Sequence, residues 1–281
     1  MKRATFRLAG VLAASSLALA ACGSDDGGSD DAGSSEASGD GITVGIKFDQ
    51  PGLGLKDGDN YSGMDVDTAI AVAAELGYTE DQITWKESPS AQRETLLETG
   101  QVDMIFATYS ITNERKEKVQ FAGPYFVAGQ DLLVSADSDI ASLDDLDGKL
   151  LCSVTGSTSA NNVSDAVPGV QLQEYGTYSE CVSQLANGTI DALTTDDTIL
   201  AGYAAQEQYA GQLTVVGVPF SEERYGVGLP KESEQCEEIN EIVAGFWEDG
   251  TMDQIIEDNF GSDYSPNADL NPPQEMGVDC G

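Results

Sequence analysis

The chain has 281 residues, which is enough for one or two domains with a full hydrophobic core. It carries 13 Lys and Arg residues against 49 Asp and Glu residues, so its formal net charge is −36. Such a charge repels nucleic acid, and the complete absence of histidine excludes Ser-His-Asp catalysis, Cys-His catalysis and His-ligated metal sites.

The N-terminus has the pattern of a bacterial lipoprotein signal. Three basic residues among the first seven precede a mainly apolar run at residues 8–20, which is too short to span a membrane as a mature helix. The run leads into L-A-A-C, a lipobox-like sequence in which Cys22 would be lipidated and become the new N-terminus. The alternative is an ordinary cleaved signal followed by an unrelated cysteine. We expect residues 1–21 to be removed and the mature protein to be extracytoplasmic, lipid-anchored to the outer face of the cell membrane.

A tether and then a repeating pattern follow. Residues 22–41 are rich in glycine, serine and aspartate with almost no apolar content, which predicts a flexible tether. Beyond it strand-like and helix-like patterns alternate, which predicts an α/β sheet. The first half predicts strands at Ile42–Lys47, Gln82–Trp85 and Asp103–Phe106, a loop at Asp49–Gly63, and helices at Met64–Leu76 and Ala91–Glu98. The second half predicts an extended segment at Phe126–Val134, strands at Leu150–Val154, Val170–Tyr175, Ile190–Thr194, Leu213–Val218 and Tyr225–Leu229, and helices at Ser157–Val163, Ser179–Ala186, Asp196–Gln206, Glu234–Glu248 and Thr251–Asn259. In the helix Glu234–Glu248 we expect Phe246 and Trp247 to belong to the core.

Four cysteines remain after the signal segment: Cys152, Cys181, Cys236 and Cys280. An even number in an exported chain favours disulfide bonds, and four cysteines allow three pairings. Because they are scattered and no histidine joins them, they do not suit a metal site.

The stretch Asp103–Arg115 reads D-M-I-F-A-T-Y-S-I-T-N-E-R. A short apolar run typical of a buried strand gives way to polar residues, and Thr112 is suited to N-cap a short helix that starts at Asn113. The hydroxyls, the free amides and the guanidinium of Arg115 suit a small carboxylate, because arginine can hold it with two parallel hydrogen bonds. The alternative is a strand, a capped helix and a surface arginine.

This stretch resembles the D-x-x-x-x-x-x-S-I-T-x-x-R segment of the solute-binding proteins that feed polar amino acids to ABC importers. Two further segments, S-P-S-A-Q-R-E-T-L and L-T-T-D, resemble the glutamate-binding lipoproteins of that family, and the resemblance covers roughly residues 42–260. It implies a two-lobe, type II periplasmic-binding-protein-like α/β fold, with hinge strands near Val127–Asp131 and Glu222–Tyr225. The implied domains are residues 42–128 plus 224–260 for lobe 1, residues 129–223 for lobe 2, and residues 261–281 for a C-terminal tail.

The resemblance also implies how an amino acid is held by its backbone groups. In the family the arginine of this segment binds the ligand's α-carboxylate, helped by hydroxyl and amide groups before it and by a turn of the second lobe. By position, this role falls on Arg115, Thr108, Ser110, Ser157 and Thr158. The α-amino group falls to Asp196, through the D-A-x-x-x-D pattern of residues 191–196. For both Ser157 and Asp196 the alternative is an ordinary helix N-cap.

A glutamate side chain brings a second carboxylate, whose burial needs further cations. Lys47, at the end of the first strand, and Arg93, at a helix start, resemble basic residues of glutamate and aspartate binders. The alternative for Lys47 is a solvated strand end. Many family members also place two aromatic rings around the ligand's side chain, and Phe48 and Tyr109 are the candidates here.

The similar lipoproteins carry cysteines in the contexts L-C-S-V and S-x-C-V. This implies a Cys152–Cys181 disulfide bond and leaves Cys236–Cys280 as the second pair.

The resemblance therefore implies a receptor, with no enzymatic activity and no cofactor, that captures L-glutamate (or aspartate or glutamine) between two lobes and delivers it to ABC permease subunits. We expect a monomer that is attached to the membrane through a lipid on Cys22 and does not bind nucleic acid. The alternatives are a cleft enzyme on the same fold, such as a dehydratase, and an amino-acid sensor without transport. An enzyme would need a positioned acid or base, and no candidate stands out.

Overall fold

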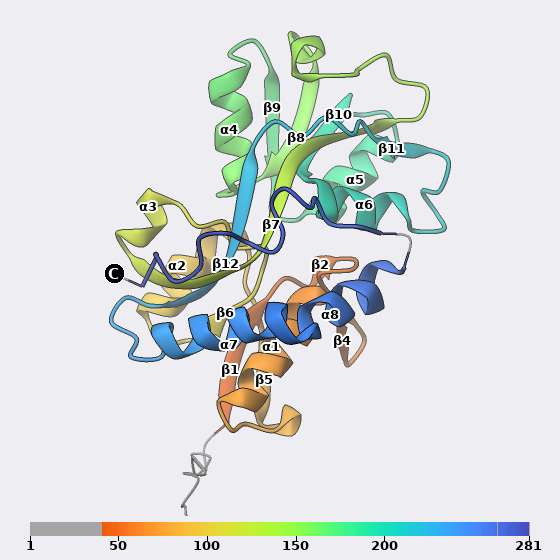
Figure 1. Cartoon of the computed structure of the whole chain (residues 1–281). Coiled ribbons are helices and arrows are strands. Elements are labelled where there is room, and N and C mark those ends of the chain that lie inside the picture. The colour runs from red at the N-terminus through yellow and green to blue at the C-terminus, as the bar shows by residue number, and fades with distance from the viewer. Residues whose placement is uncertain (1–40, 263, 281) are drawn as a thin grey trace, which may run out of the picture. The chain divides into compact units, whose positions relative to one another are not determined.

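The computed structural model describes residues 41–262 and 264–280, which lie within one compact unit, Ser35–Gly281 (Figure 1). The expected signal segment at 1–21, the lipidation site Cys22 and nearly all of the expected tether lie outside the described residues. Within the described ranges, no helix combines the length and the apolar character that a membrane crossing requires.

Nine strands of the described residues form one mixed sheet, in the order β5-β1-β6-β12-β7-β10-β8-β9, with β11 beside β7. The strands are β1 (Ile42–Ile46), β5 (Ile83–Glu87), β6 (Met104–Ile105), β7 (Val119–Ser135), β8 (Leu150–Val154), β9 (Gln171–Tyr175), β10 (Ala192–Asp196), β11 (Leu213–Val215) and β12 (Glu222–Pro230). β1 pairs parallel with β5 and β6, and β8 pairs parallel with β9 and β10. The sheet therefore contains two parallel groups of strands, which agrees with the α/β sheet that the strand–helix alternation predicts.

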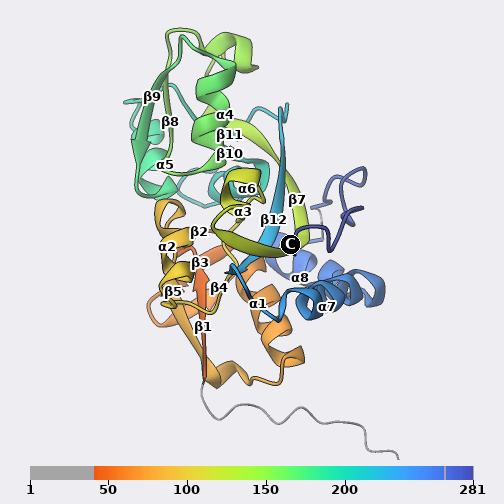
Figure 2. The same cartoon turned by 90° about the vertical axis from the view of Figure 1, so that its left-hand side faces the viewer.

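The long strand β7 and its neighbour β12 join these two groups. The first part of β7 pairs antiparallel with β12, from Val119 opposite Pro230 to Gly129 opposite Glu222, and its last part pairs with β10 and β11. The two strands run side by side between the groups in Figures 1 and 2. This is the arrangement that the resemblance implies for hinge strands, although β7 begins well before the expected start at Phe126. The expected residue bounds of the two lobes stay a prediction.

Eight α-helices occur in the part of the chain that the structure describes. They are α1 (Met64–Glu75), α2 (Arg93–Glu98), α3 (Asn113–Lys116), α4 (Thr158–Ala166), α5 (Tyr178–Ala186), α6 (Asp197–Ala204), α7 (Cys236–Asp249) and α8 (Thr251–Phe260). These agree with the predicted helices to within a few residues at their ends. The largest difference is at the end of α4, which reaches Ala166 where Val163 was expected, and before α2 the chain first forms a 3-10 turn at Ser90–Gln92.

The expectation of an irregular loop at Asp49–Gly63 is wrong. The segment forms three short strands, β2 (Asp49–Gln50), β3 (Gly54–Asp57) and β4 (Asn60–Ser62), which pair antiparallel in that order. Gly58, in the turn between β3 and β4, has a φ of +61°, the left-handed conformation that suits two-residue hairpin turns. The glycine and aspartate content that suggests a loop is here the signal of a tight hairpin.

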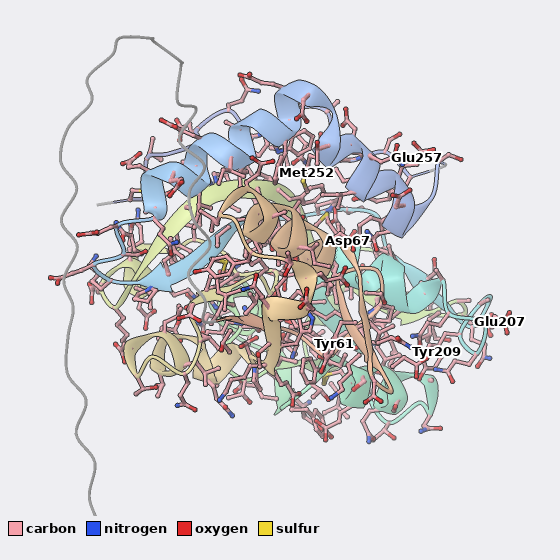
Figure 3. The ribbon with its side chains drawn as sticks, turned by 90° about the horizontal axis from the view of Figure 1, so that it is seen from below. Tyr61, Asp67, Glu207, Tyr209, Met252 and Glu257 are labelled. Atoms are coloured by element: carbon pink, nitrogen blue, oxygen red, sulfur yellow. A yellow bond between two sulfur atoms is a disulfide. The ribbon has the colours of Figure 1, made fainter. Side chains whose placement is uncertain are left out.

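Helices α7 and α8 pack onto the core beside α1. Phe246 is buried, and Trp247 packs partly buried against the same core cluster, as predicted for both. The hydroxyl of Thr68 on α1 lies 4.0 Å from the sulfur of Met252 on α8, which is labelled in Figure 3. This packing holds α1 in place, and α1 carries Asp65, which positions Thr108 of the site.

Both predicted disulfide bonds are present. Cys152–Cys181 joins β8 to α5, and Cys236–Cys280 joins the start of α7 to the end of the tail. The described tail residues form no helix or strand. Within the tail, Asn271 lies against β7: its side chain accepts a hydrogen bond from the N–H of Val127 at 3.0 Å and donates one to the carbonyl of Val127 at 2.8 Å. The tail is thus bonded to the strand that joins the two groups.

A buried carboxylate on α1 positions the segment that follows β6. Asp65 is fully buried; it accepts hydrogen bonds from the N–H of Thr108 at 3.0 Å and from the hydroxyl of Tyr125 at 2.6 Å. Thr108 has a φ of +46°, a left-handed conformation that costs a non-glycine residue about 1–2 kcal/mol. The bond to Asp65 offsets this cost and holds Thr108 in place. Burial raises the pKa of Asp65 to about 6.

We expect Asp65→Asn to flatten the pH dependence of stability between about pH 4 and pH 6. In this range native Asp65 keeps its proton whereas unfolded Asp65 has released it, so the free energy of unfolding falls as the pH rises. The total fall that this one group contributes is about 3 kcal/mol, and asparagine, which does not titrate, removes it. Urea unfolding at several pH values measures the effect, with Asp67→Asn on the same helix as the control. Parallel curves for the wild type and Asp65→Asn would contradict the assignment.

Candidate functional site

A small, partly open cavity lies between the ends of β6 and β10 and the starts of α2, α4 and α5. It holds about 230 Å³ that is not filled by protein atoms. Its lining is almost entirely polar and consists of Ser90, Arg93, Thr108, Ser110, Arg115, Ser157, Thr158, Ser159, Tyr178 and Asp196. Seven of these residues are predicted from the sequence; Ser90, Ser159 and Tyr178 are not. Two more open hollows adjoin the cavity, and Thr158 lies on the border of both.

Arg115 is held rigidly at one wall of the cavity. Thr112 caps α3 as predicted, and its hydroxyl accepts a hydrogen bond from the N–H of Arg115 at 3.2 Å. The guanidinium donates to the carbonyl of Ser110 at 2.7 Å and to that of Gly156 at 3.2 Å, and it lies 3.5 Å from a carboxylate oxygen of Glu94. These partners come from both strand groups, so the guanidinium is fixed where the two groups meet. It is only 8% exposed, which excludes the surface-arginine alternative.

The start of α4 forms the facing wall. Ser157 caps this helix, since its hydroxyl accepts a hydrogen bond from the N–H of Ala160 at 3.1 Å, and it also lines the cavity. The capping alternative and the binding prediction are therefore compatible. The hydroxyl of Thr158 lies 3.3 Å from that of Ser110 and donates to Glu223 at 2.8 Å. Hydroxyls and helix N–H groups thus gather beside Arg115, an arrangement that suits a carboxylate.

Asp196 supplies a carboxylate within the cavity lining. It stands at the start of α6, but its side chain makes no capping hydrogen bond, so the N-cap alternative does not hold. One oxygen accepts from the hydroxyl of Tyr225 at 2.7 Å, whereas the other is buried and has no hydrogen-bond partner among the described residues. Burial raises the pKa of Asp196 well above its usual value, and Glu223 adds to this shift. A cation placed beside the unpartnered oxygen would stabilise the charged form.

Arg93 brings a second guanidinium to the cavity. It is the first residue of α2, is 2% exposed, and donates through Nε to the carbonyl of Ser88 at 3.2 Å. Its guanidinium carbon lies 5.0 Å from the centroid of the Tyr109 ring, and that of Arg115 lies 4.9 Å from the same centroid. Burial and then the charge of Arg115 lower the pKa of Arg93. The cavity therefore has two neighbouring cations, which favours an anionic ligand.

Lys47 lies close to the cavity but not in its lining. It is fully buried, which excludes the solvated-strand alternative, and its Nζ lies 3.0 Å from Oδ1 of Asp49. The pair is at ion-pair distance without hydrogen-bond alignment, because neither atom has a hydrogen-bond partner among the described residues. The ammonium also lies 5.9 Å from the ring centroid of Tyr178, which does line the cavity. Burial lowers the pKa of Lys47, and Asp49 opposes that shift.

The two aromatic candidates are not brought to the cavity lining. The ring of Phe48 packs 5.4 Å from that of Tyr61, and the ammonium of Lys56 lies 5.0 Å above it. Tyr109 is buried beneath the two guanidinium groups and makes an edge contact with Phe121 at 4.8 Å. Tyr109 therefore packs against the two guanidinium groups, and neither Phe48 nor Tyr109 lines the cavity.

Tyr178 is the main lining residue that sequence reasoning missed. Thr177 and Glu180 form a capping box, and this T-x-x-E pattern starts α5 at Tyr178. The predicted helix starts one residue later, at Ser179, so the prediction does not place Tyr178 in the first turn of α5, where it faces the cavity. Burial raises the pKa of its hydroxyl to about 12.

No group of three or more Cys, Asp or Glu side chains that could hold a metal ion occurs within residues 41–262 and 264–280.

Known proteins are similar to this chain in both sequence and fold. Residues 42–262 match the family model of bacterial extracellular solute-binding proteins, family 3. The chain is 48% identical over 278 residues to the glutamate-binding protein GluB of Corynebacterium glutamicum, covering 93% of each. It is 39% identical over 220 residues to the ABC transporter glutamine-binding protein GlnH of Bacillus subtilis, covering 77% of this chain and 80% of GlnH. A solved structure of an ancestral arginine-binding protein bound to glutamine matches with a TM-score of 0.73 and 36% identity, covering 79% of this chain and 98% of that one.

These similarities confirm the expected mixed α/β fold of periplasmic amino-acid-binding proteins. They also agree with a site that binds and contains no catalytic machinery, since the matching proteins are binding proteins. The chain belongs to the bacterial extracellular solute-binding proteins of family 3.

Proposed function

We propose that the protein is the substrate-binding lipoprotein of an ABC importer, that it holds L-glutamate between two lobes, and that it delivers the amino acid to the permease subunits. The observation that carries this proposal is the pairing of charges in the lining of one cavity. Arg115 and the hydroxyls around it lie in this lining together with Asp196, one of whose carboxylate oxygens has no hydrogen-bond partner among the described residues. A molecule with a carboxylate and an ammonium on one carbon matches both groups at once.

The cations beside the cavity support glutamate as the amino acid. Burying a second carboxylate without a partner would be costly, and the Arg93 guanidinium in the lining offsets that cost. Lys47 adds a buried ammonium that has no aligned hydrogen-bond acceptor among the described residues. The relatives support the same class of ligand, because one is named for glutamate and another for glutamine. Aspartate and glutamine are the competing ligands within this proposal.

The two lobes of the proposal are residues 42–128 with 224–260 and residues 129–223. β7 and β12 connect them, and the contacts of Ser110 with Thr158 and of Arg115 with Gly156 cross between them. A ligand bound in the cavity would touch both lobes and so favour the conformation in which they meet.

The location of the protein follows from the N-terminal segment within this proposal. The family is extracellular. We infer that residues 1–21 are removed, that Cys22 carries the lipid and that residues 22–41 are a tether between the membrane and the first strand.

We expect Arg115→Ala to weaken binding of every amino acid tested by at least about thirty-fold. Truncating one partner of a buried charge pair costs about 2–5 kcal/mol, roughly thirty- to several-thousand-fold in affinity. Isothermal titration with glutamate, aspartate and glutamine measures the loss. Lys118→Ala, an exposed cation just after the same helix, is the control and should stay within a few-fold of wild type. Affinity retained in Arg115→Ala would place the α-carboxylate elsewhere.

We expect Arg93→Gln to weaken glutamate binding by roughly thirty-fold and to change glutamine binding only a few-fold. The reason is that the guanidinium offsets the charge of the side-chain carboxylate, which glutamine lacks. The same titrations measure both ligands. Glutamine binding as tight as glutamate in the wild type would contradict the proposed preference, and a preference for arginine would contradict the whole side-chain assignment.

We expect Cys22→Ala to abolish incorporation of radiolabelled palmitate and to release the protein into the medium. Without the thiol no lipid can be attached, and the tether alone has too little apolar surface to hold a membrane. Continued labelling of the variant would show that the lipid is attached at another residue.

A further inference from the structure

Asp49 lies where several elements meet, and the proposed function so far gives it no part beyond its pairing with Lys47. It is the first residue of β2, two positions after Lys47. Its Oδ1 lies 3.0 Å from Nζ of Lys47, and its Oδ2 accepts hydrogen bonds from the N–H groups of Tyr178 at 2.9 Å and Ser179 at 3.3 Å. The hydroxyl of Tyr203 on α6 donates to the carbonyl of Asp49 and lies 3.3 Å from Oδ2. One side chain thus links the end of β1 to α5 and α6.

The start of α5 needs this carboxylate. The first N–H groups of a helix have no acceptor within the helix. Of the N–H groups that start the helix, its cap Thr177 accepts only that of Glu180, at 3.3 Å. Asp49 accepts from the two N–H groups before it, and its negative charge suits the positive end of the helix dipole.

Tyr178, whose backbone Asp49 holds, lines the cavity. The ammonium of Lys47 lies 5.9 Å from the centroid of the Tyr178 ring. Lys47 and Asp49 therefore contact Tyr178, which lines the cavity together with Arg93. These contacts join residues from both strand groups.

The charge of Lys47 depends on its surroundings in the same place. The charged and titratable groups that face it are Asp49 of β2, Arg93 of α2, Glu87 at the end of β5 and Tyr178 of α5. Burial and Arg93 both disfavour the protonated ammonium, and Asp49 is the main group that favours it, ahead of Glu87. Removing the charge of Asp49 would leave a buried cation next to another cation.

We propose that Asp49 is a positioning residue that sets the ligand's side-chain end of the cavity: it keeps Lys47 in place and charged as a partner for an anionic side chain, and it fixes Tyr178 by completing the start of α5. This inference rests on the proposed function, because it concerns how the same cavity selects an anionic amino acid. Asp49 does not itself line the cavity, and it acts through Lys47 and Tyr178.

The test compares Asp49→Asn with the wild type by isothermal titration of glutamate and of glutamine at several pH values from 6 to 9. We expect wild-type affinities for both ligands to change little with pH. In Asp49→Asn, glutamate binding should weaken by at least ten-fold at pH 8 and weaken further as the pH rises, because Lys47 loses its proton. Glutamine binding should stay within about three-fold and remain flat, since an amide does not require the ammonium.

Three further variants complete the design. Lys47→Met should lose glutamate affinity by a similar factor but without added pH dependence, and the double variant should be no worse than Lys47→Met alone. Asp59→Asn, an exposed acid in the same segment, is the matched control and should behave as wild type. An unchanged glutamate profile in Asp49→Asn would overturn the proposal. So would an equal, pH-independent loss of glutamate and glutamine, because that pattern indicates a helix cap alone.

A ligand-free measurement separates this inference from the proposed function. The titration of Lys47 can be followed by NMR on protein labelled with ¹³C at the lysine ε-carbon, with Lys47→Met identifying the signal. We expect Asp49→Asn to lower the titration midpoint by at least about one pH unit. If the wild type binds no amino acid, the proposed function fails, and this midpoint still decides the role of Asp49. An unchanged midpoint would contradict it.

Discussion

Buried positive charge is the constraint on which the site depends. Arg93 and Arg115 each lie about 5 Å from the centre of the same tyrosine ring, so two like charges share one apolar support. Such a pair loses hydration and is mutually repulsive, and it is tolerated only where acceptors surround it. Carbonyl groups and Glu94 provide some of that compensation. In a chain of net charge −36, the enclosure of these cations is what makes a small anion the favoured occupant.

The same cations explain why the cavity needs both groups of strands. The guanidinium of Arg115 starts from α3 yet bonds to the carbonyl of Gly156, just before α4. Thr158 likewise contacts Ser110 across the boundary and Glu223 on β12. No single group of strands supplies enough partners, so the site is complete only when the two groups meet. β7 and β12, which connect the groups, therefore govern the geometry of the site without lining most of it.

Much of this could be predicted from the sequence, because the relevant signals were local. The capping role of Thr112, the core position of Phe246 and the strand–helix alternation depend on near neighbours, and the motif around Arg115 is compact. Asp49 and Tyr178 could not be found in this way, since they are 129 positions apart and are joined only by folding. The β3–β4 hairpin could not be predicted for another reason. A high content of glycine and aspartate is typical of any loop, whereas a hairpin is indicated only by the position of Gly58 in a two-residue turn between two extended segments.

The C-terminal tail has a consequence for the mechanics of the molecule. The family match ends at residue 262, yet Asn271 occupies both backbone hydrogen-bonding groups of Val127, and Cys280 is covalently bonded to α7. A chain that ended at residue 262 would lack the two hydrogen bonds that Asn271 makes with Val127 of β7. The stiffness of the connection between the two strand groups therefore depends partly on residues that lie beyond the family match.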